Sequence, residues 1–306
     1  MSDPTTEIDL PPVASLPALV TPFDADETVD HGALSEIVAW TIDRGVDGLV
    51  PCGTTGEFAS LSGEERRAVI ETTVEAAGGR VPVIAGAGAT TVPGVLGFIQ
   101  DAAAVGADAA LVPPPYYHAA NDPAGNRDFY KRVADGSDLP IYLYNIPSCA
   151  SGPIAVETVS ELATREEVRG LKDTSGDLSA IERFVAKTPA SFRVFEGYDD
   201  HFVGARAMGS DGGINALAGV FPAACRTLCD ALDAGEFGKA RTIQQQVLSP
   251  VFEVCLEYGF AAGAKVALRE RNVIEQATVR PPLVELEGSA RAAVTDAVER
   301  AATYPK

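Results

Sequence analysis

Short apolar runs alternate with amphipathic stretches along the first two thirds of this sequence. Eight such runs are present, at residues 16–23, 48–53, 82–88, 109–112, 140–145, 168–172, 192–196 and 212–216. Near-continuous apolar strands that alternate with helices indicate a parallel sheet with helices on its faces. Eight strand–helix units fit a closed barrel, so the pattern predicts an α/β fold of the (β/α)8 TIM-barrel type.

An open, doubly wound sheet would show the same alternation of strands and helices. Its dinucleotide-binding form carries a GxGxxG turn after the first strand. No such turn follows residues 16–23, and the glycine-rich stretch 86–91 lacks the third glycine. The closed barrel is therefore favoured.

Several helices have recognisable start signals. Asp30 is placed to cap a helix over 32–44, and Ser62 opens the next helix with two acidic residues in its first turn. Ser, Asp and first-turn carboxylates satisfy the free N–H groups and the positive end of a helix. Residues 175–177 lead in the same way into a helix over 178–187.

The strand signal ends after Phe221-Pro222. Helical stretches follow near 236–259, 261–272 and 288–302, interrupted by Arg280-Pro281-Pro282. They lie outside the eight-fold repeat and predict a small C-terminal helical extension. The predicted organisation is a flexible tail at 1–12, a (β/α)8 barrel at 13–225 and a C-terminal helical region at 226–306.

Composition and charge exclude several classes of function. The 306 residues have a net charge of −19 and a pI near 4.5, which argues against nucleic acid or anionic membranes as partners. Excess carboxylate with few lysines suits a salt-rich cytosol, because salt screens self-repulsion; an ordinary acidic enzyme is the alternative. The chain opens without a signal-peptide pattern, and no apolar run approaches the roughly 20 residues of a membrane span.

The cysteines and histidines indicate no metal site. The five cysteines form no CxxC pair, and only three histidines are present. Structural zinc sites need clustered Cys and His ligands. We expect reduced thiols, a cytoplasmic location, no metal and no cofactor.

Candidate chemistry is expected at the carboxyl ends of the strands, where barrel enzymes place their catalytic groups. These positions hold hydroxyls, phenols, one amine and exposed backbone amides, at Thr21-Pro22, 53–57, Tyr116-Tyr117, 144–147, 172–174, 197–200 and Gly213-Ile214. They include no histidine pair and no cluster of metal ligands. This set fits amine catalysis on a carbonyl better than metal-assisted hydrolysis.

Lys172 is the amine of this set. The chain has six lysines, and the other five are assigned to polar helical stretches or, for Lys306, to the terminus. An amine at the mouth of an apolar strand loses hydration, which favours its neutral, nucleophilic form. Such a lysine can condense with a ketone to form a Schiff base. The alternative is a structural lysine that is paired with Asp173 or Asp177.

Three motifs at predicted strand ends resemble a known family. They are Gly-Thr-Thr-Gly-Glu at 53–57, Tyr-Asn-Ile-Pro at 144–147 and Gly-Leu-Lys-Asp-Thr-Ser at 170–175. In this order they resemble the pyruvate-dependent Schiff-base lyases and synthases, which include dihydrodipicolinate synthase, N-acetylneuraminate lyase and 2-keto-3-deoxygluconate aldolase. The resemblance runs from about Pro17 to the C-terminus.

The resemblance implies a role for each motif. Lys172 would attack the keto carbon of pyruvate, and Thr54 and Thr55 would bind its carboxylate. Tyr144 would relay protons, and Thr54 would link Tyr144 to a tyrosine from a neighbouring subunit, a position that Tyr117 matches. A homotetramer is therefore expected. Taken singly, each of these residues also has an ordinary explanation in turn formation or packing.

The aldehyde partner is predicted from one departure from the family pattern. The synthase carries an arginine two residues after the proline of Tyr-Asn-x-Pro, which binds the carboxylate of aspartate semialdehyde. Cys149 stands at that position here and cannot replace a bidentate guanidinium. The departure argues against the synthase.

Other positions are similar to the sialic-acid lyase. Asp199 and Asp200 match an acidic pair that contacts a hydroxylated tail in that lyase. Sugar hydroxyls are therefore expected to bind Thr174, Asp199 and Asp200, and Gly197 and Ile214 are expected to line the same site. Arg127 is a candidate phosphate ligand by position only.

We therefore expect a class I aldolase that reversibly cleaves 2-keto-3-deoxygluconate or its 6-phosphate to pyruvate and glyceraldehyde or its 3-phosphate. The alternatives are a 4-hydroxy-tetrahydrodipicolinate synthase, an N-acetylneuraminate lyase, and a barrel that binds a keto acid without turnover.

Overall fold

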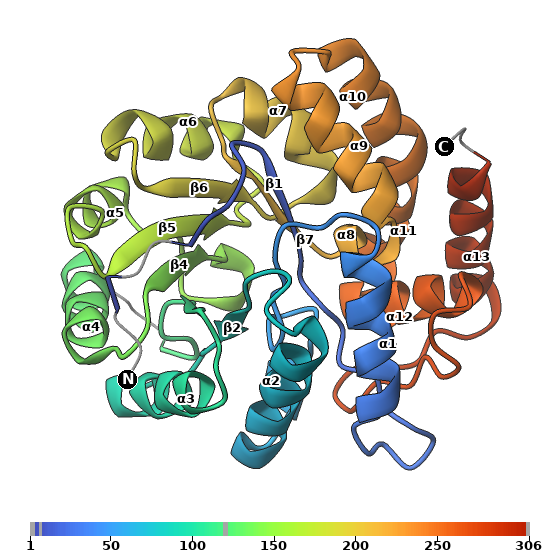
Figure 1. Cartoon of the computed structure of the whole chain (residues 1–306), viewed down its shortest axis with the longest axis horizontal. Helices are drawn as coiled ribbons and strands as arrows, with labels where there is room; N and C mark the ends of the chain where they lie inside the picture. The colour runs from blue at the N-terminus through green and yellow to red at the C-terminus, as the bar shows by residue number, and fades with distance from the viewer. Residues whose placement is uncertain (1–3, 6–7, 119–121, 304–306) are drawn as a thin grey trace.

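A curled parallel sheet surrounded by helices forms the body of the molecule (Figure 1). The computed structural model describes residues 4–5, 8–118 and 122–303. The sheet has the order β1-β7-β6-β5-β4-β3-β2. Its strands are β1 (Ala14–Pro17), β2 (Ile84–Gly86), β3 (Ala109–Val112), β4 (Ile141–Asn145), β5 (Val168–Asp173), β6 (Arg193–Glu196) and β7 (Gly212–Asn215).

Seven of the eight barrel positions hold regular strands, and residues 48–53 fill the remaining one, between β1 and β2, without a regular strand. Isolated parallel bridges join Ala18 to Val50 and Leu49 to Val83, so this segment lies between β1 and the start of β2. Backbone bonds from Leu49 N to Pro82 O and from Ile84 N to Leu49 O, both 2.9 Å, continue the pairing. The predicted (β/α)8 architecture is confirmed, with one of its eight positions held by bridges alone.

Helices cover the outside of the sheet in sequence order (Figure 1). They are α1 (His31–Ile42), α2 (Gly63–Ala77), α3 (Val92–Ala104), α4 (Pro123–Gly136), α5 (Val156–Leu162), α6 (Leu178–Lys187), α7 (Phe202–Ala207) and α8 (Leu217–Val220). The predicted caps are confirmed: Asp30 accepts from Ala33 N, Ser62 and Glu65 form a capping box, and Asp177 accepts from Ser179 N.

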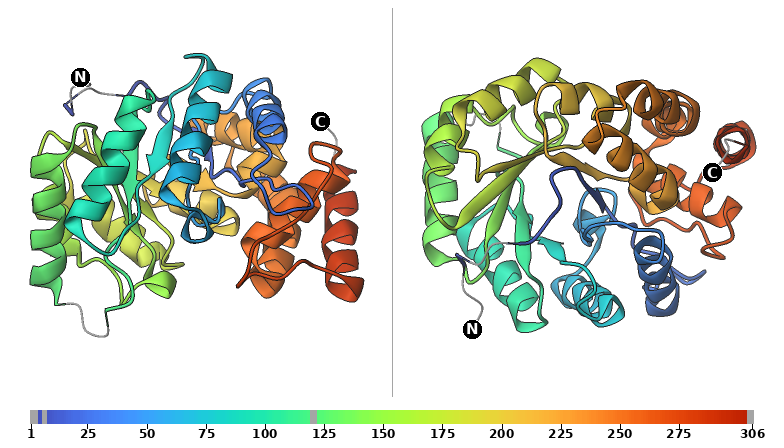
Figure 2. Two further views of the ribbon diagram at one scale, coloured as in Figure 1. Left: turned by 90° about the horizontal axis from the view of Figure 1, so that it is seen from below. Right: turned by 45° about the horizontal axis from the view of Figure 1, so that its top comes forward.

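The C-terminal helices gather on one side of the barrel (Figure 2). They are α9 (Pro222–Asp233), α10 (Phe237–Ile243), a π-helical segment (Gln244–Leu248), α11 (Ser249–Tyr258), α12 (Phe260–Glu270) and α13 (Gly288–Ala302). One apolar cluster joins them to barrel residues such as Leu19, Ile37 and Phe202. The predicted boundary between residues 225 and 226 lies inside α9, because that helix runs without a break from the barrel into the extension.

Part of the predicted flexible tail packs against the barrel. Leu10 is buried in the same cluster as Ala14 and Leu16, and Arg193 donates to the carbonyl oxygens of Leu10 (3.3 Å) and Pro11 (2.7 Å). Arg193 begins β6, so this segment lies against the amino end of the barrel. An apolar side chain and two backbone acceptors thus attach this stretch to the barrel; the flexibility of the tail stays a prediction.

In the part of the chain that the structure describes, no helix has the length and apolar character needed to cross a membrane.

Candidate active site

Lys172 lies near the carboxyl end of β5, where its strand pairs with β4. Its parallel partner there is Tyr144, and its Nζ lies 4.5 Å from the centroid of the Tyr144 ring. Lys172 is 5% exposed and is not among the described lysines that form ion pairs, which are Lys131, Lys239 and Lys265. An amine and a phenol are therefore held together at one end of the barrel.

The structural alternative for Lys172 required an ion pair with Asp173 or Asp177. Asp173 is instead held by Asn145 Nδ2, which donates to Oδ1 at 2.5 Å, and by Ser175 Oγ, which donates to Oδ2 at 2.6 Å. Asp177 caps α6 and pairs with Arg183 at 3.3 Å. Both carboxylates thus have other partners, and neither of them pairs with Lys172.

The Gly53–Glu57 turn brings two hydroxyls to the same end of the barrel. Thr54 Oγ1 lies 3.3 Å from Tyr144 OH, and the next residue, Thr55, is buried. Thr21 Oγ1 donates to the carbonyl of Gly56 at 2.7 Å and ties the turn to the end of the first apolar run. A Cβ on Gly86 would lie 1.9 Å from the carbonyl oxygen of Cys52, so only glycine lets β2 approach this turn.

A cavity of about 260 Å³ opens beside these groups. It is lined by Thr54, Glu57, Phe58, Ala59, Ser60, Pro113, Pro114, Tyr116, Tyr144, Ile146, Cys149, Ala150, Pro282 and Leu283. Lys172 does not line this cavity itself, but the Tyr144 ring beside it does. None of these described lining residues is a lysine, arginine or histidine. The predicted specificity residue Cys149 lies in this wall and is exposed.

Several predicted substrate contacts lie away from this cavity. Asp199 is buried, its Oδ1 accepts from Leu217 N at 2.9 Å, and burial raises the pKa of its carboxyl to about 7. The backbone carbonyl of Asp200 accepts from Gln244 Nε2, and Ile214 is fully enclosed in the barrel core. A Cβ on Gly197 would lie 2.0 Å from Thr174 Oγ1. Glycine at position 197 therefore allows the loops after β5 and β6 to approach each other closely. Contacts of these residues with a substrate stay predictions.

Tyr117 and Arg127 lie at the periphery. Tyr117 is 98% exposed and has a positive φ of 73°, so its ring projects away from its own barrel. Its predicted contact with a neighbouring subunit stays a prediction. Arg127 lies on α4 and pairs with Glu161 of α5 at 3.6 Å. It is not among the residues that line the cavity beside Tyr144, and its role as a phosphate ligand stays a prediction.

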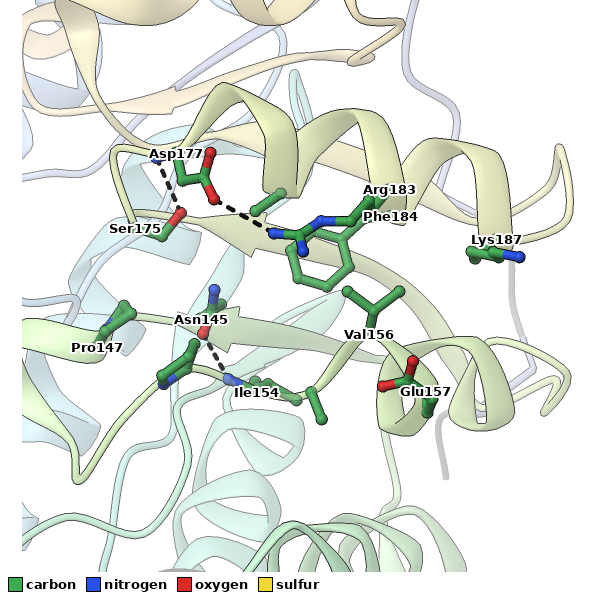
Figure 3. A pocket seen from close by; sticks show the side chains of 13 residues that line it. Asn145, Pro147, Ile154, Val156, Glu157, Ser175, Asp177, Arg183, Phe184 and Lys187 are labelled. Carbon is green, nitrogen blue, oxygen red and sulfur yellow. Dashed lines mark hydrogen bonds and ion pairs between the residues drawn. The ribbon is translucent and has the colours of Figure 1, made fainter.

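A second cavity of about 480 Å³ lies outside the strand ends of β4 and β5, between α5 and α6 (Figure 3). Its inner wall contains Asn145 and Ser175, the two residues that bind Asp173. Asn145 Oδ1 also accepts from Ile154 N at 2.8 Å. Asp173, the residue after Lys172, is therefore fixed by residues that line this second cavity.

Glu196 and Lys265 are among the buried charged residues that were not recognised from sequence. Glu196 accepts from the backbone N–H groups of Gly197 and Tyr198, and burial raises the pKa of its carboxyl to about 8. Lys265 on α12 is completely buried, so its assignment to a polar helical stretch was wrong. Its apolar neighbours, Ala261–Ala264 and Val266–Leu268, were the available signal.

Comparison with known proteins agrees with this geometry. The sequence profile of the dihydrodipicolinate synthetase family matches residues 12–301. A 4-hydroxy-tetrahydrodipicolinate synthase from Ruegeria pomeroyi is 39% identical over 287 residues, which cover 94% of this chain and 98% of that protein.

Solved structures agree as well. A dihydrodipicolinate synthase from Bacillus anthracis matches with a TM-score of 0.92 and 30% identity, covering 98% of this chain and 100% of that one. The prophage protein YagE from E. coli K12, solved in complex with pyruvate, matches with a TM-score of 0.89 and 28% identity over 95% of this chain and 98% of that one. The chain therefore belongs to the dihydrodipicolinate synthetase family, whose enzymes are metal-independent Schiff-base lyases that form carbon–carbon bonds with pyruvate.

Proposed function

We propose that this enzyme joins pyruvate to an aldehyde that carries no carboxylate, and that its reverse reaction cleaves a 2-keto-3-deoxy sugar acid. The observation that supports this choice is the cavity beside Tyr144. Cys149 lies in its wall, and no lysine, arginine or histidine is among the described residues that line it. An aldehyde with its own carboxylate would lose charge-assisted hydrogen bonds there.

The proposed chemistry begins at the amine of Lys172. The amine attacks the keto carbon of the sugar acid, and loss of water leaves a protonated imine. With the imine at C2 of the sugar acid, the bond between C3 and C4 then breaks. Its electron pair forms the C2–C3 double bond of an enamine, and the C4 alcohol loses its proton and becomes the aldehyde. Protonation of the enamine at its terminal carbon and hydrolysis release pyruvate and restore the amine.

Tyr144 and the Thr54–Thr55 turn support these steps. The Tyr144 hydroxyl accepts the proton from the carbinol during cleavage and returns it during addition. Thr54 orients the Tyr144 hydroxyl through a hydrogen bond of 3.3 Å between Thr54 Oγ1 and Tyr144 OH. The Thr55 hydroxyl and the backbone N–H groups of Thr54 and Thr55 bind the pyruvate carboxylate, since N–H groups and hydroxyls are its natural donors.

The second candidate is 4-hydroxy-tetrahydrodipicolinate synthase. Relatives from Ruegeria pomeroyi and Rhizobium meliloti, 39% and 37% identical, carry that name. The comparisons thus favour this alternative over the sugar-acid aldolase. The same enamine would attack aspartate semialdehyde in that case. The cation-free wall at Cys149 is the observation against it.

One set of assays separates the candidates. Purified enzyme is given 2-keto-3-deoxygluconate, its 6-phosphate or N-acetylneuraminate, and pyruvate release is measured; in parallel, pyruvate and aspartate semialdehyde are supplied together and condensation is measured. Pyruvate release from a keto-deoxy sugar acid supports the proposal. Efficient condensation of aspartate semialdehyde without sugar-acid cleavage establishes the synthase instead.

The covalent step has its own test. Borohydride with pyruvate is expected to add a reduced pyruvyl group to Lys172, located by peptide mass spectrometry, and Lys172→Ala is expected to abolish the label. Labelling of a different lysine would contradict the mechanism.

A further inference from the structure

A completely buried ion pair joins the Gly53–Glu57 turn to the C-terminal helical region. Glu57 Oε1 lies 2.5 Å from Lys265 Nζ, and both side chains have no exposed surface. Glu57 ends the turn that carries Thr54 and Thr55, whereas Lys265 lies on α12. The pair therefore connects the predicted carboxylate-binding turn to an element outside the eight-fold repeat.

Further contacts of Glu57 and Lys265 come from the segment after α12 and from Phe23. Lys265 Nζ donates to the carbonyl of Thr278 at 2.7 Å and lies 4.0 Å from the centroid of the Phe23 ring. The backbone N–H of Arg280 donates to Glu57 Oε2 at 3.2 Å. Both carboxylate oxygens of Glu57 thus contact the C-terminal region.

The Arg280 side chain anchors this segment on the barrel. Its guanidinium binds Glu65 of α2, with Nη2–Oε1 at 2.6 Å and Nη1–Oε2 at 3.0 Å. It also donates to the backbone carbonyls of Glu27 and Ser60. These bonds hold the residue whose backbone N–H donates to Glu57 Oε2.

The backbone of the turn needs such support. Glu57 has a positive φ of 54°, a left-handed conformation that is unfavourable for a residue with a side chain. Its N–H donates to the carbonyl of Thr54 at 3.1 Å, so rotation at Glu57 would move the threonine. Glu57 also lines the cavity together with Thr54 and Tyr144.

Stability alone is a poor explanation for this pair. Taking two charges out of water costs about as much as their attraction returns, so buried pairs add little net stability. Burial lowers the pKa of the Lys265 ammonium to about 8, although the nearby Glu57 carboxylate opposes that shift. A role in fixing geometry accounts better for a charge pair at this position.

We propose that Glu57 is a positioning residue, which Lys265 and Arg280 of the C-terminal region hold so that the Thr54–Thr55 turn keeps the geometry that binds the pyruvate carboxylate. The inference rests on the proposed function in assigning pyruvate to this turn. It makes the C-terminal helical region a working part of the active site and not an appendage.

The test uses variants that separate positioning from stability. Glu57→Gln alone leaves the Lys265 charge buried without a partner and endangers folding. Glu57→Gln combined with Lys265→Met removes both charges and is expected to keep a melting temperature close to that of the wild type. Arg280→Gln removes the ion pair with Glu65 and leaves the buried pair of Glu57 and Lys265 in place.

The readout is borohydride trapping of pyruvate on Lys172, followed by intact mass as a function of pyruvate concentration. The double variant is expected to raise the half-saturating pyruvate concentration by roughly 10- to 100-fold, the scale of a small misplacement of binding groups. The trapping rate at saturation is expected to change much less, since Lys172 and Tyr144 are untouched. Arg280→Gln is expected to shift half-saturation in the same direction by a smaller factor.

A matched control is available at the other end of the barrel. Arg226 Nη1 pairs with Asp47 Oδ2 at 2.7 Å, and Asp47 also accepts from Ser15 N near the start of β1. Asp47→Asn combined with Arg226→Met removes an ion pair remote from the turn. It is expected to leave half-saturation by pyruvate unchanged.

Each outcome decides one claim. A folded double variant with wild-type half-saturation overturns the inference; if the double variant does not fold, an unchanged value in Arg280→Gln overturns it. Absence of trapping in the wild type at any pyruvate concentration contradicts the proposed function and is distinguishable from both.

Discussion

The hydroxyl pair of Tyr144 and Thr54 offers a demanding test of the proposed proton relay. Tyr144 is almost completely buried, its ring lies beside Lys172 Nζ, and its OH is 3.3 Å from Thr54 Oγ1. Tyr144→Phe removes the hydroxyl and keeps the ring. Thr54→Val removes the partner hydroxyl and keeps the side-chain shape.

The two changes are expected to differ greatly in size. Loss of a general acid–base group lowers turnover by roughly 10²- to 10⁴-fold, or about 3–5 kcal/mol in the barrier. The bond from Thr54 joins two neutral groups, and such a bond contributes about 0.5–1.5 kcal/mol, or roughly 2- to 10-fold. In a Tyr144→Phe background the partner hydroxyl is already gone, so Thr54→Val is expected to add almost nothing.

The assay is exchange of the pyruvate methyl hydrogens in D₂O, followed by proton NMR. It reports imine and enamine formation and needs no aldehyde, so it does not depend on the substrate assignment. Tyr258→Phe, on α11 in the C-terminal region, serves as the control for loss of a tyrosine hydroxyl. If Tyr144→Phe exchanges at close to the wild-type rate, the relay is misassigned. If Thr54→Val costs the same factor in both backgrounds, Thr54 does not act through Tyr144.

Three further predictions follow from other parts of the molecule. Cys149→Arg is expected to recover part of the roughly 10- to 150-fold that a charge-assisted bond is worth in the condensation of aspartate semialdehyde, and to impair sugar-acid cleavage in parallel assays. No gain in condensation would contradict the role of this cavity wall. Hydrogen bonds from Arg280 lower the pKa of Glu65 from 4.5 to about 2. The stabilisation from this pair is therefore complete above about pH 4.5 and lost as pH falls toward 2. In Glu65→Gln the free energy of unfolding, measured with urea, is expected to depend less on pH between these values. An unchanged pH dependence in the variant would refute the pairing. With −19 charges per chain, we expect subunit dissociation by light scattering, and loss of activity, below roughly 0.5 M salt, because salt screens like-charge repulsion; an assembled, active enzyme in dilute buffer would argue against adaptation to salt.

The sequence predicted the barrel because its elements are encoded locally. Apolar runs and capping residues such as Asp30, Ser62 and Asp177 depend on neighbours within one turn or strand, and the structure confirms them. The helices of the C-terminal region were also found near their predicted positions. The 48–53 segment differed in kind, since its pairing is limited to bridges, and the predicted stretch 236–259 contains a π-helical segment.

The grouping of Lys172, Tyr144 and Thr54 was also within reach of the sequence. Parallel strands of a barrel bring their carboxyl ends to one face, so three motifs at strand ends had to meet there. The sequence alone did not reveal whether Lys172 was paired, because that depended on the partners of Asp173 and Asp177. Asn145 and Ser175 supply those for Asp173.

Tertiary structure alone decided which charged groups are buried and what lines the cavity. Burial of Lys265 depends on Glu57, a residue far away in the sequence, and the same holds for Asp199 with its partner Leu217. Leu10 packs beneath the barrel only because strands from distant parts of the chain form its pocket. Local patterns specify helices and strands, whereas burial, charge pairing and cavity walls arise from residues that become neighbours only after the chain has closed into a barrel.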